Sequence, residues 1–100
     1  MKMINMERKE TINTENILSV IQEKPNYEIL KTIKIKSSAS SNFLLGKFGL
    51  NYTEIEQKLN TLKDNGLVEL DRLIGFERYY LTDFGEEILN DSNIKEIVYK

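Results

Sequence analysis

The clearest pattern in the chain is an apolar stripe at helical spacing between Asn51 and Gly66. The stripe recurs at intervals of four and three residues, which puts its members on one face of an α-helix. It is formed by Ile55, Leu59 and Leu62. Asn51 and Glu54 have the spacing of a capping box, and Gly66 suits the left-handed conformation that ends many helices. The sequence therefore predicts a helix over about residues 51–64.

Beyond Gly66 the hydrophobic period changes from that of a helix to that of strands. Residues 67–70 and 76–81 are rich in apolar and aromatic types that strands favour, and a polar turn separates them. This pattern predicts a β-hairpin with its tip near residues 73–76. Thr82 is a suitable N-cap for a further helix, whose first turn is acidic, as the positive end of a helix dipole favours.

Shorter helices are predicted upstream, with identifiable breaks between them. The first covers residues 14–24 and ends at Pro25. The second begins at Asn26, whose side chain can cap it. A serine-rich loop at residues 37–41 precedes a compact helix at residues 43–48.

The helices at 43–48 and 51–64 are joined by a turn short enough to set them at a steep angle, as in a helix-turn-helix. The hairpin and another helix follow. This order predicts an α+β fold that is mostly α: a three-helix core plus a β-hairpin wing, with an extra N-terminal helix and a C-terminal helix.

Two segments resemble the signature of a known family. They are Asn-Gly-Leu-Val-Glu-Leu at 65–70 and Tyr-Tyr-Leu-Thr-Asp-Phe-Gly-Glu-Glu-Ile-Leu at 79–89. They are similar to winged helix-turn-helix regulators, closest to the small archaeal winged-helix DNA-binding proteins, with PadR-like and MarR-like regulators as wider relatives. The resemblance covers about residues 26–90, and it implies the fold more firmly than the function.

The chain is therefore expected to divide into four parts. These are a flexible N-terminal segment at 1–13, an additional helix at 14–25, the winged helix-turn-helix domain at 26–91 and a C-terminal tail or short helix at 92–100.

A homodimer is expected, because specific repressors gain affinity by placing two domains on neighbouring half-sites. Candidate dimerisation residues form apolar stripes near both ends of the chain: Ile17, Leu18, Ile21, Ile94, Ile97 and Val98. The archaeal relatives dimerise through a long C-terminal helix that this sequence does not show, so the N-terminal helix is the favoured interface.

Charge distribution supports nucleic-acid binding more than net charge does. The chain of 100 residues carries a formal net charge of −2, which argues against coating DNA by charge alone. Residues 24–63, however, hold seven lysines against three glutamates, whereas residues 64–100 hold four basic against nine acidic residues. Positive charge is thus concentrated around the predicted helix-turn-helix, as DNA binding requires.

Composition argues against several other functions. The sequence contains no Cys and no His, which removes thiolate chemistry, the commonest metal ligand and the commonest base near neutral pH. No residue cluster has the spacing of a catalytic unit, so we expect no enzyme activity, no metal and no cofactor. The absence of an apolar span and of a secretory signal predicts a cytoplasmic, nucleoid-associated protein without membrane contact.

In a helix-turn-helix the second helix lies in the major groove, with its N-terminal half toward the bases. The candidate base contacts on that helix are Tyr52, Thr53, Glu56, Gln57 and Asn60. Gln57 and Asn60 suit adenine, because an amide can bond both N6 and N7. Glu56 does not fit easily among these candidates, because its side chain is negatively charged. It would have to accept a hydrogen bond from cytosine N4 or point away from the DNA.

Phosphate contacts are predicted on both sides of that helix and at the wing, about residues 71–78, which would reach the backbone or the minor groove. The candidates are Ser40, Ser41, Lys47, Lys58, Lys63, Arg72 and Arg78. Cross-strand ion pairs, either Arg72 with Glu77 or Asp71 with Arg78, are the competing interpretation at the wing.

The sequence leaves more than one function open. The first is a dimeric, sequence-specific transcriptional regulator on double-stranded DNA, and a plasmid or viral DNA-maintenance factor would use the same binding mode. The second is a winged-helix protein-interaction module without DNA binding. It is favoured by the acidic total, by Glu54 and Glu56 on the predicted reading helix, and by the apolar pair Leu73-Ile74. Tyr79 and Tyr80 should point to opposite faces of their strand, one into the core and the other outward.

Overall fold

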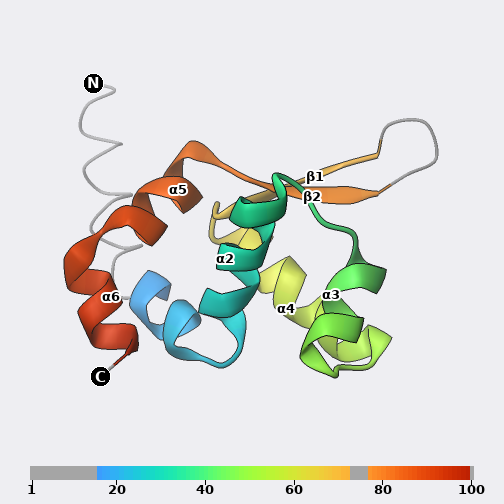
Figure 1. The fold of residues 1–100 in the computed structure, drawn as a ribbon, viewed down its shortest axis with the longest axis horizontal. Helices are drawn as coiled ribbons and strands as arrows, with labels where there is room; N and C mark the ends of the chain where they lie inside the picture. Colours follow the sequence, from blue (N-terminus) through green and yellow to red (C-terminus); the bar gives the residue numbers. More distant parts are fainter. Residues whose placement is uncertain (1–15, 73–76, 100) are drawn as a thin grey trace.

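The computed structural model describes residues 16–72 and 77–99. Residues 16–22 are helical, and the elements that follow are α2 (Asn26–Lys36), α3 (Ser41–Phe48), α4 (Tyr52–Asp64), β1 (Val68–Asp71), β2 (Arg78–Leu81), α5 (Asp83–Asn90) and α6 (Ser92–Val98) (Figure 1). The segment predicted at 1–13 and the predicted wing tip at 73–76 lie outside the described residues.

The core is built around α2, which lies between the N- and C-terminal helices on one side and α3 and α4 on the other (Figure 1). The inward side of α2 is fully buried at Ile29, Leu30 and Ile33. The stripe predicted on α4 is also fully buried, at Ile55, Leu59 and Leu62. The hydrophobic period in the sequence therefore identified the packed face of α4 correctly.

The predicted ends of α4 are confirmed. The Asn51 side-chain oxygen accepts a hydrogen bond from the Glu54 backbone N–H at 2.8 Å, and the Glu54 carboxylate accepts one from the Asn51 N–H at 3.0 Å. Gly49 closes α3 at φ +67°, and Gly66 follows α4 at φ +76°. These caps satisfy backbone groups that helix ends would otherwise leave without partners.

The wing is an antiparallel hairpin in which Leu70 pairs with Tyr79 and Asp71 with Arg78. Tyr79 is 2% exposed and Tyr80 is 37% exposed, so the predicted alternation is confirmed. A short bridge adds Ala39 to the open edge of β2. The Ala39 N–H donates to the Tyr79 carbonyl at 3.0 Å, and the Tyr79 N–H donates to the Ala39 carbonyl at 2.8 Å.

Thr82 and Gly85 lock α5 against the turn that follows α4. The Thr82 hydroxyl accepts from the Gly85 N–H at 2.9 Å and donates to the Gly66 carbonyl at 2.6 Å. Gly85 approaches so closely that a Cβ there would overlap the Leu67 carbonyl oxygen. The Leu-Thr-x-x-Gly motif of the sequence is therefore a packing motif, in which Thr caps the helix and Gly permits the backbone contact.

The expectation that Asn26 caps α2 was wrong. Pro25 occupies the N-cap position, and no side chain caps the helix there. The Asn26 side chain is buried and its Nδ2 donates to the Val20 carbonyl at 2.8 Å. It closes the end of the preceding helical segment at 16–22, because the last carbonyls of a helix need donors from elsewhere.

The C-terminal residues fold back onto the core as α6. Asp91 caps this helix, accepting from the backbone N–H groups of Asn93 and Ile94 at 2.9 and 3.2 Å. Ile94 and Val98 pack against the core. The predicted short C-terminal helix is thus present and is part of the packed structure.

We expect Gly85→Ala to lower the free energy of unfolding by about 1 to 3 kcal/mol, because the added methyl group must push helix α5 away from Leu67. Urea unfolding followed by far-UV circular dichroism measures this change. Gly46 in α3 is the matched control, since nothing lies within 4 Å of a Cβ placed there.

Gly46→Ala should raise stability by about 0.5 to 1 kcal/mol, as replacing a helical Gly usually does. Equal effects of the two substitutions would contradict the close packing of α5 on Leu67.

Candidate nucleic-acid interface

Helix α4 presents a polar outward face opposite its buried stripe. Thr53, Gln57 and Asn60 are exposed and recur at spacings of four and three, so they share that face. Tyr52 begins the helix and is 59% exposed. The structure therefore brings four of the predicted base contacts to solvent along a single rigid helix.

Glu56 points away from that face. The Ser41 hydroxyl donates a hydrogen bond to the Glu56 carboxylate at 2.9 Å, and both residues are half-buried. The carboxylate lies at the first residue of α3, where the positive end of the helix dipole stabilises negative charge. In this position Glu56 and Ser41 hold α3 against α4, which removes the difficulty of an acidic group among the base contacts.

Tyr79 lies close to the same contact. Burial raises the pKa of its phenol, and the nearby Glu56 carboxylate raises it further. A tyrosine phenol is already neutral near physiological pH. Because its pKa is raised further, Tyr79 adds no charge to the junction between the wing and the two helices.

The start of α3 offers polar groups to solvent. Ser40 is its N-cap, with a hydroxyl that accepts from the Phe43 backbone N–H at 3.1 Å. Lys47 lies in the last turn of α3 and is exposed, with its Nζ 5.9 Å from the Phe48 ring centre. The predicted candidates Ser40 and Lys47 thus lie at opposite ends of the helix that precedes α4.

Lys36 is a cation that sequence reasoning did not single out. It ends α2, and its Nζ lies 4.5 Å from the ring centre of Phe43 in α3. The available signal was its position directly before the serine-rich loop, within the lysine-rich part of the chain. What only the structure shows is its contact with α3.

The two lysines of α4 differ in their surroundings. Lys58 forms an ion pair with Glu23 at 3.4 Å, because the loop that follows the segment 16–22 runs beside α4. Lys63 is exposed in the last turn of α4, and no carboxylate pairs with it in the described part of the chain. Of these two, Lys63 is the better placed to meet an outside anion.

The two arginines of the wing also differ in their partners. Arg72 pairs with Glu77 at 3.3 Å in an exposed cross-strand ion pair, one of the two that the sequence suggested. Arg78 stands opposite Asp71 but turns to Ser38, donating from Nε to the Ser38 hydroxyl at 2.7 Å and from Nη2 to the Ser38 carbonyl at 3.2 Å. Arg78 therefore fastens the loop before α3 to the base of the wing.

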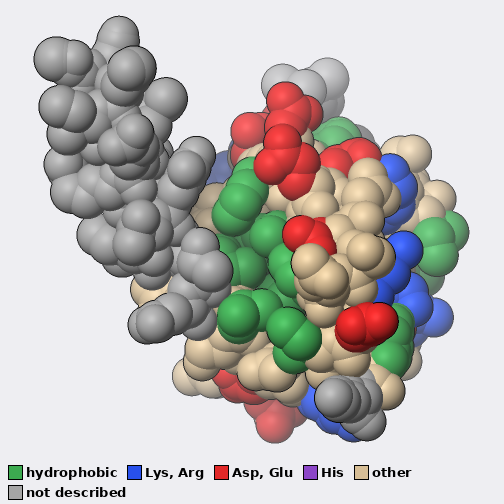
Figure 2. Space-filling view, turned by 90° about the vertical axis from the view of Figure 1, so that its left-hand side faces the viewer, with side chains coloured by type: hydrophobic (Ala, Val, Ile, Leu, Met, Phe, Trp, Pro, Cys, Tyr) green, Lys and Arg blue, Asp and Glu red, His purple; other side chains and the backbone are tan. Residues whose placement is uncertain are grey.

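The predicted dimerisation residues gather on one side of the molecule. Ile17 and Ile21 are buried within the chain, and Leu18, Ile94 and Val98 are partly buried against the core. Ile97 is 38% exposed. Figure 2 looks onto the side that carries α5 and α6, and apolar side chains are visible there in a continuous group.

Two absences hold for the residues described. None of the helices within 16–72 and 77–99 is long and apolar enough to cross a membrane. Over the same residues, no group of three or more acidic side chains is arranged to hold a metal ion.

Comparison with known proteins identifies the type of domain. The family described as winged helix-turn-helix matches residues 14–98. No curated protein matches the chain. The crystal structure of the transcriptional regulator HlyU from Vibrio vulnificus CMCP6 is similar, with a TM-score of 0.67 and 23% identity over 97% of this chain and 95% of that chain.

A second similar structure is that of AbfR of Staphylococcus epidermidis, with a TM-score of 0.63 and 18% identity over 99% of this chain and 74% of that chain. The predicted fold, mostly helical with a three-helix core and a hairpin wing, is confirmed. Closeness to the archaeal, PadR-like or MarR-like proteins stays a prediction.

We expect Arg78→Ala to lower the free energy of unfolding by about 1 to 3 kcal/mol, because two charge-assisted hydrogen bonds to Ser38 are lost. Arg72→Ala removes only an exposed ion pair and should change stability by less than about 0.5 kcal/mol. Thermal and urea unfolding of the two variants measure the difference. Equal stabilities would contradict the anchoring contact of Arg78.

Proposed function

Because this chain belongs to the winged helix-turn-helix family, we propose that it binds double-stranded DNA in a sequence-specific manner, as a dimeric transcriptional regulator. The observation that carries this proposal is the uncovered face of α4. Thr53, Gln57 and Asn60 present hydrogen-bonding groups to solvent on a helix whose other sides are fixed by packing. The description of the neighbour HlyU as a transcriptional regulator supports the same role here.

In the proposed complex, α4 lies in the major groove. Gln57 and Asn60 read base edges, and adenine is their best partner because each amide can bond both N6 and N7. Thr53 and Tyr52 lie nearer the start of the helix, the end that enters the groove most deeply in this motif. Glu56 stays with Ser41 and takes no part in reading bases.

Phosphates on either side of the groove are met by cations and by a serine hydroxyl. Lys36 lies beside α3, Lys47 lies in its last turn, and Lys63 lies in the last turn of α4. At the start of α3, the Ser40 hydroxyl can donate to a phosphate, while the Glu56 carboxylate stays with Ser41. Arg72 completes the set at the wing, where its exposed ion pair with Glu77 exchanges readily for a phosphate.

The proposed dimer forms through the side that carries α5, α6 and the helical segment 16–22. Ile17 and Ile21 hold that segment against the core and contribute to the interface indirectly. Leu18, Phe84 and Ile97 are the partly exposed apolar side chains that a second copy would cover. Pairing through this side leaves α4 of each copy free for its own half-site.

The remaining parts of the proposal follow from this mode of binding. The protein acts in the cytoplasm on nucleoid DNA, without catalytic chemistry. A DNA-maintenance role in a plasmid or virus would use the same contacts. A module that binds only proteins is the competing function, and the partly exposed Phe84 and Ile97 are the surface it would use.

Fluorescence anisotropy with mixed duplex DNA tests the proposal. We expect binding whose logarithm falls linearly with the logarithm of salt concentration, because each phosphate contact releases a condensed counterion. An affinity weaker than about 10⁻⁴ M at low salt, with no salt dependence, would mean that the protein-interaction module is the correct function.

A second experiment tests base reading by Gln57, using a preferred sequence selected from randomised duplexes. Gln57→Ala should cost about 1 to 3 kcal/mol on that sequence and relax the preference at one base pair. Gln22→Ala, which changes an exposed glutamine on the helical segment 16–22, is the matched control and should leave binding unchanged. An equal loss on every sequence for Gln57→Ala would show that it does not read bases.

A further inference from the structure

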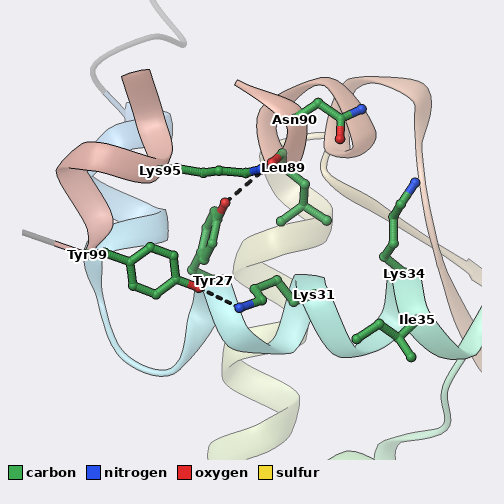
Figure 3. A pocket seen from close by; sticks show the side chains of 8 residues that line it. All are labelled: Tyr27, Lys31, Lys34, Ile35, Leu89, Asn90, Lys95 and Tyr99. Carbon is green, nitrogen blue, oxygen red and sulfur yellow. Dashed lines mark hydrogen bonds between the residues drawn. The ribbon is translucent and has the colours of Figure 1, made fainter. Parts of the chain in front are cut away.

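A second surface lies away from α4, where α5 and α6 fold over the start of α2. A cleft of about 360 Å³ opens there, lined by side chains from all three helices (Figure 3). That volume is within the usual range of small-molecule sites. The sequence did not reveal this cleft, because its walls come from segments about 60 residues apart that meet only in the folded chain.

The inner wall of the cleft is apolar. Tyr27 and Leu89 are buried there, and the Tyr27 hydroxyl donates to the Leu89 carbonyl at 3.4 Å. Ile35 stands at the rim and is 79% exposed, the largest exposed fraction among the large hydrophobic side chains described. An isoleucine side chain this exposed, beside an apolar wall, is suited to contact the apolar part of a ligand.

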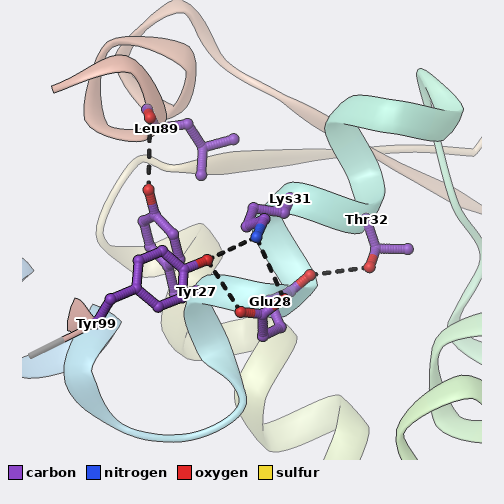
Figure 4. Close-up of polar contacts among 6 residues, drawn as sticks. All are labelled: Tyr27, Glu28, Lys31, Thr32, Leu89 and Tyr99. Atoms are coloured by element: carbon purple, nitrogen blue, oxygen red, sulfur yellow. Dashed lines mark hydrogen bonds and ion pairs between the residues drawn. The ribbon is translucent and has the colours of Figure 1, made fainter. Parts of the chain in front are cut away.

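Tyr99 closes one end of the cleft. Its ring meets that of Tyr27 edge to face, with centres 5.6 Å apart. Its hydroxyl accepts from Lys31 Nζ at 2.6 Å and donates to the Glu28 carboxylate at 3.1 Å (Figure 4). These bonds hold α6 to α2 across 68 residues of sequence, so the wall is formed before any ligand arrives.

The polar groups of the lining are strongly basic. Lys31, Lys34 and Lys95 line the cleft, and none of its described lining residues is acidic. Lys34 pairs with Glu86 at 2.7 Å and Lys31 with Glu28 at 3.7 Å, and both carboxylates lie outside the lining. Lys95 has no carboxylate partner among the residues that the structure describes. Lys95, with two ion-paired ammonium groups nearby and an apolar wall beside it, favours a ligand with one negatively charged end and one apolar end.

We propose that this cleft binds an organic carboxylate with an apolar body. The carboxylate accepts from Lys95 and from the neighbouring ammonium groups, while the body covers Ile35 and lies against the Tyr27 and Leu89 wall. The charge of the lysines excludes organic cations, and the apolar wall favours the ligand over a simple inorganic anion. This site is independent of DNA binding, so either proposal can fail without the other.

Chemical-shift titration of the ¹⁵N-labelled protein tests the site, with naphthalene-2-carboxylate as the probe. We expect saturable shifts at backbone amides of α2, the end of α5 and α6. Naphthalene-2-carboxamide has the same body without charge, and acetate has the charge without the body. Each should bind at least about tenfold weaker, the equivalent of one lost charge-assisted or apolar contact.

Variants locate the site. Lys95→Gln should weaken naphthalene-2-carboxylate binding about tenfold, whereas Lys63→Gln on α4 should leave it unchanged. Ile35→Ser should also weaken binding, with Ile97→Ser on α6 as its matched control. Both isoleucines are partly or largely exposed, so these changes should leave the fold intact.

The proposal is overturned if no saturable shifts occur up to about ten millimolar probe, a concentration at which any specific site of this kind would be filled. It is equally overturned if the carboxamide or acetate binds as tightly as the carboxylate, or if each control variant weakens binding as much as its partner.

Discussion

The structure depends on the paired hydrogen bonds between Ala39 and Tyr79. They join the loop before α3 to strand β2 of the wing, and the side chain of Tyr79 is buried in the core. Arg78 adds two further bonds to Ser38 on the same loop. The wing, the start of α3 and, through Ser41 and Glu56, the side of α4 therefore form one connected unit.

Several polar residues that the sequence suggested as DNA contacts instead hold this unit together. Glu56, Ser41 and Arg78 have partners within the chain, because a half-buried polar group must be hydrogen-bonded to be tolerated. The surface proposed for DNA is therefore narrower, around Gln57 and Asn60, with cations at its margins. The residues that orient the helices are thus different from those proposed to contact DNA.

The side of α2 that faces away from α3 and α4 contributes to two other surfaces. There α5, α6 and the helical segment 16–22 provide the apolar side proposed for a second copy, and the basic cleft closed by Tyr99 (Figures 2 and 3). Helix α2 packs against α5 and β2, so it connects these surfaces to the base of the wing. Its central position explains why so much of it is buried.

The sequence by itself determined the order of helices and hairpin, the N-caps of α4 and α5, and the packed stripe of α4. These are set by periods of a few residues and by local backbone needs, such as the Asn51 and Glu54 cap and the left-handed turn at Gly66. Only the tertiary structure decided which polar side chains are free, because the partners of Arg78 and Tyr99 lie 40 and 71 residues away. Pairing over such distances depends on packing, which no local pattern specifies.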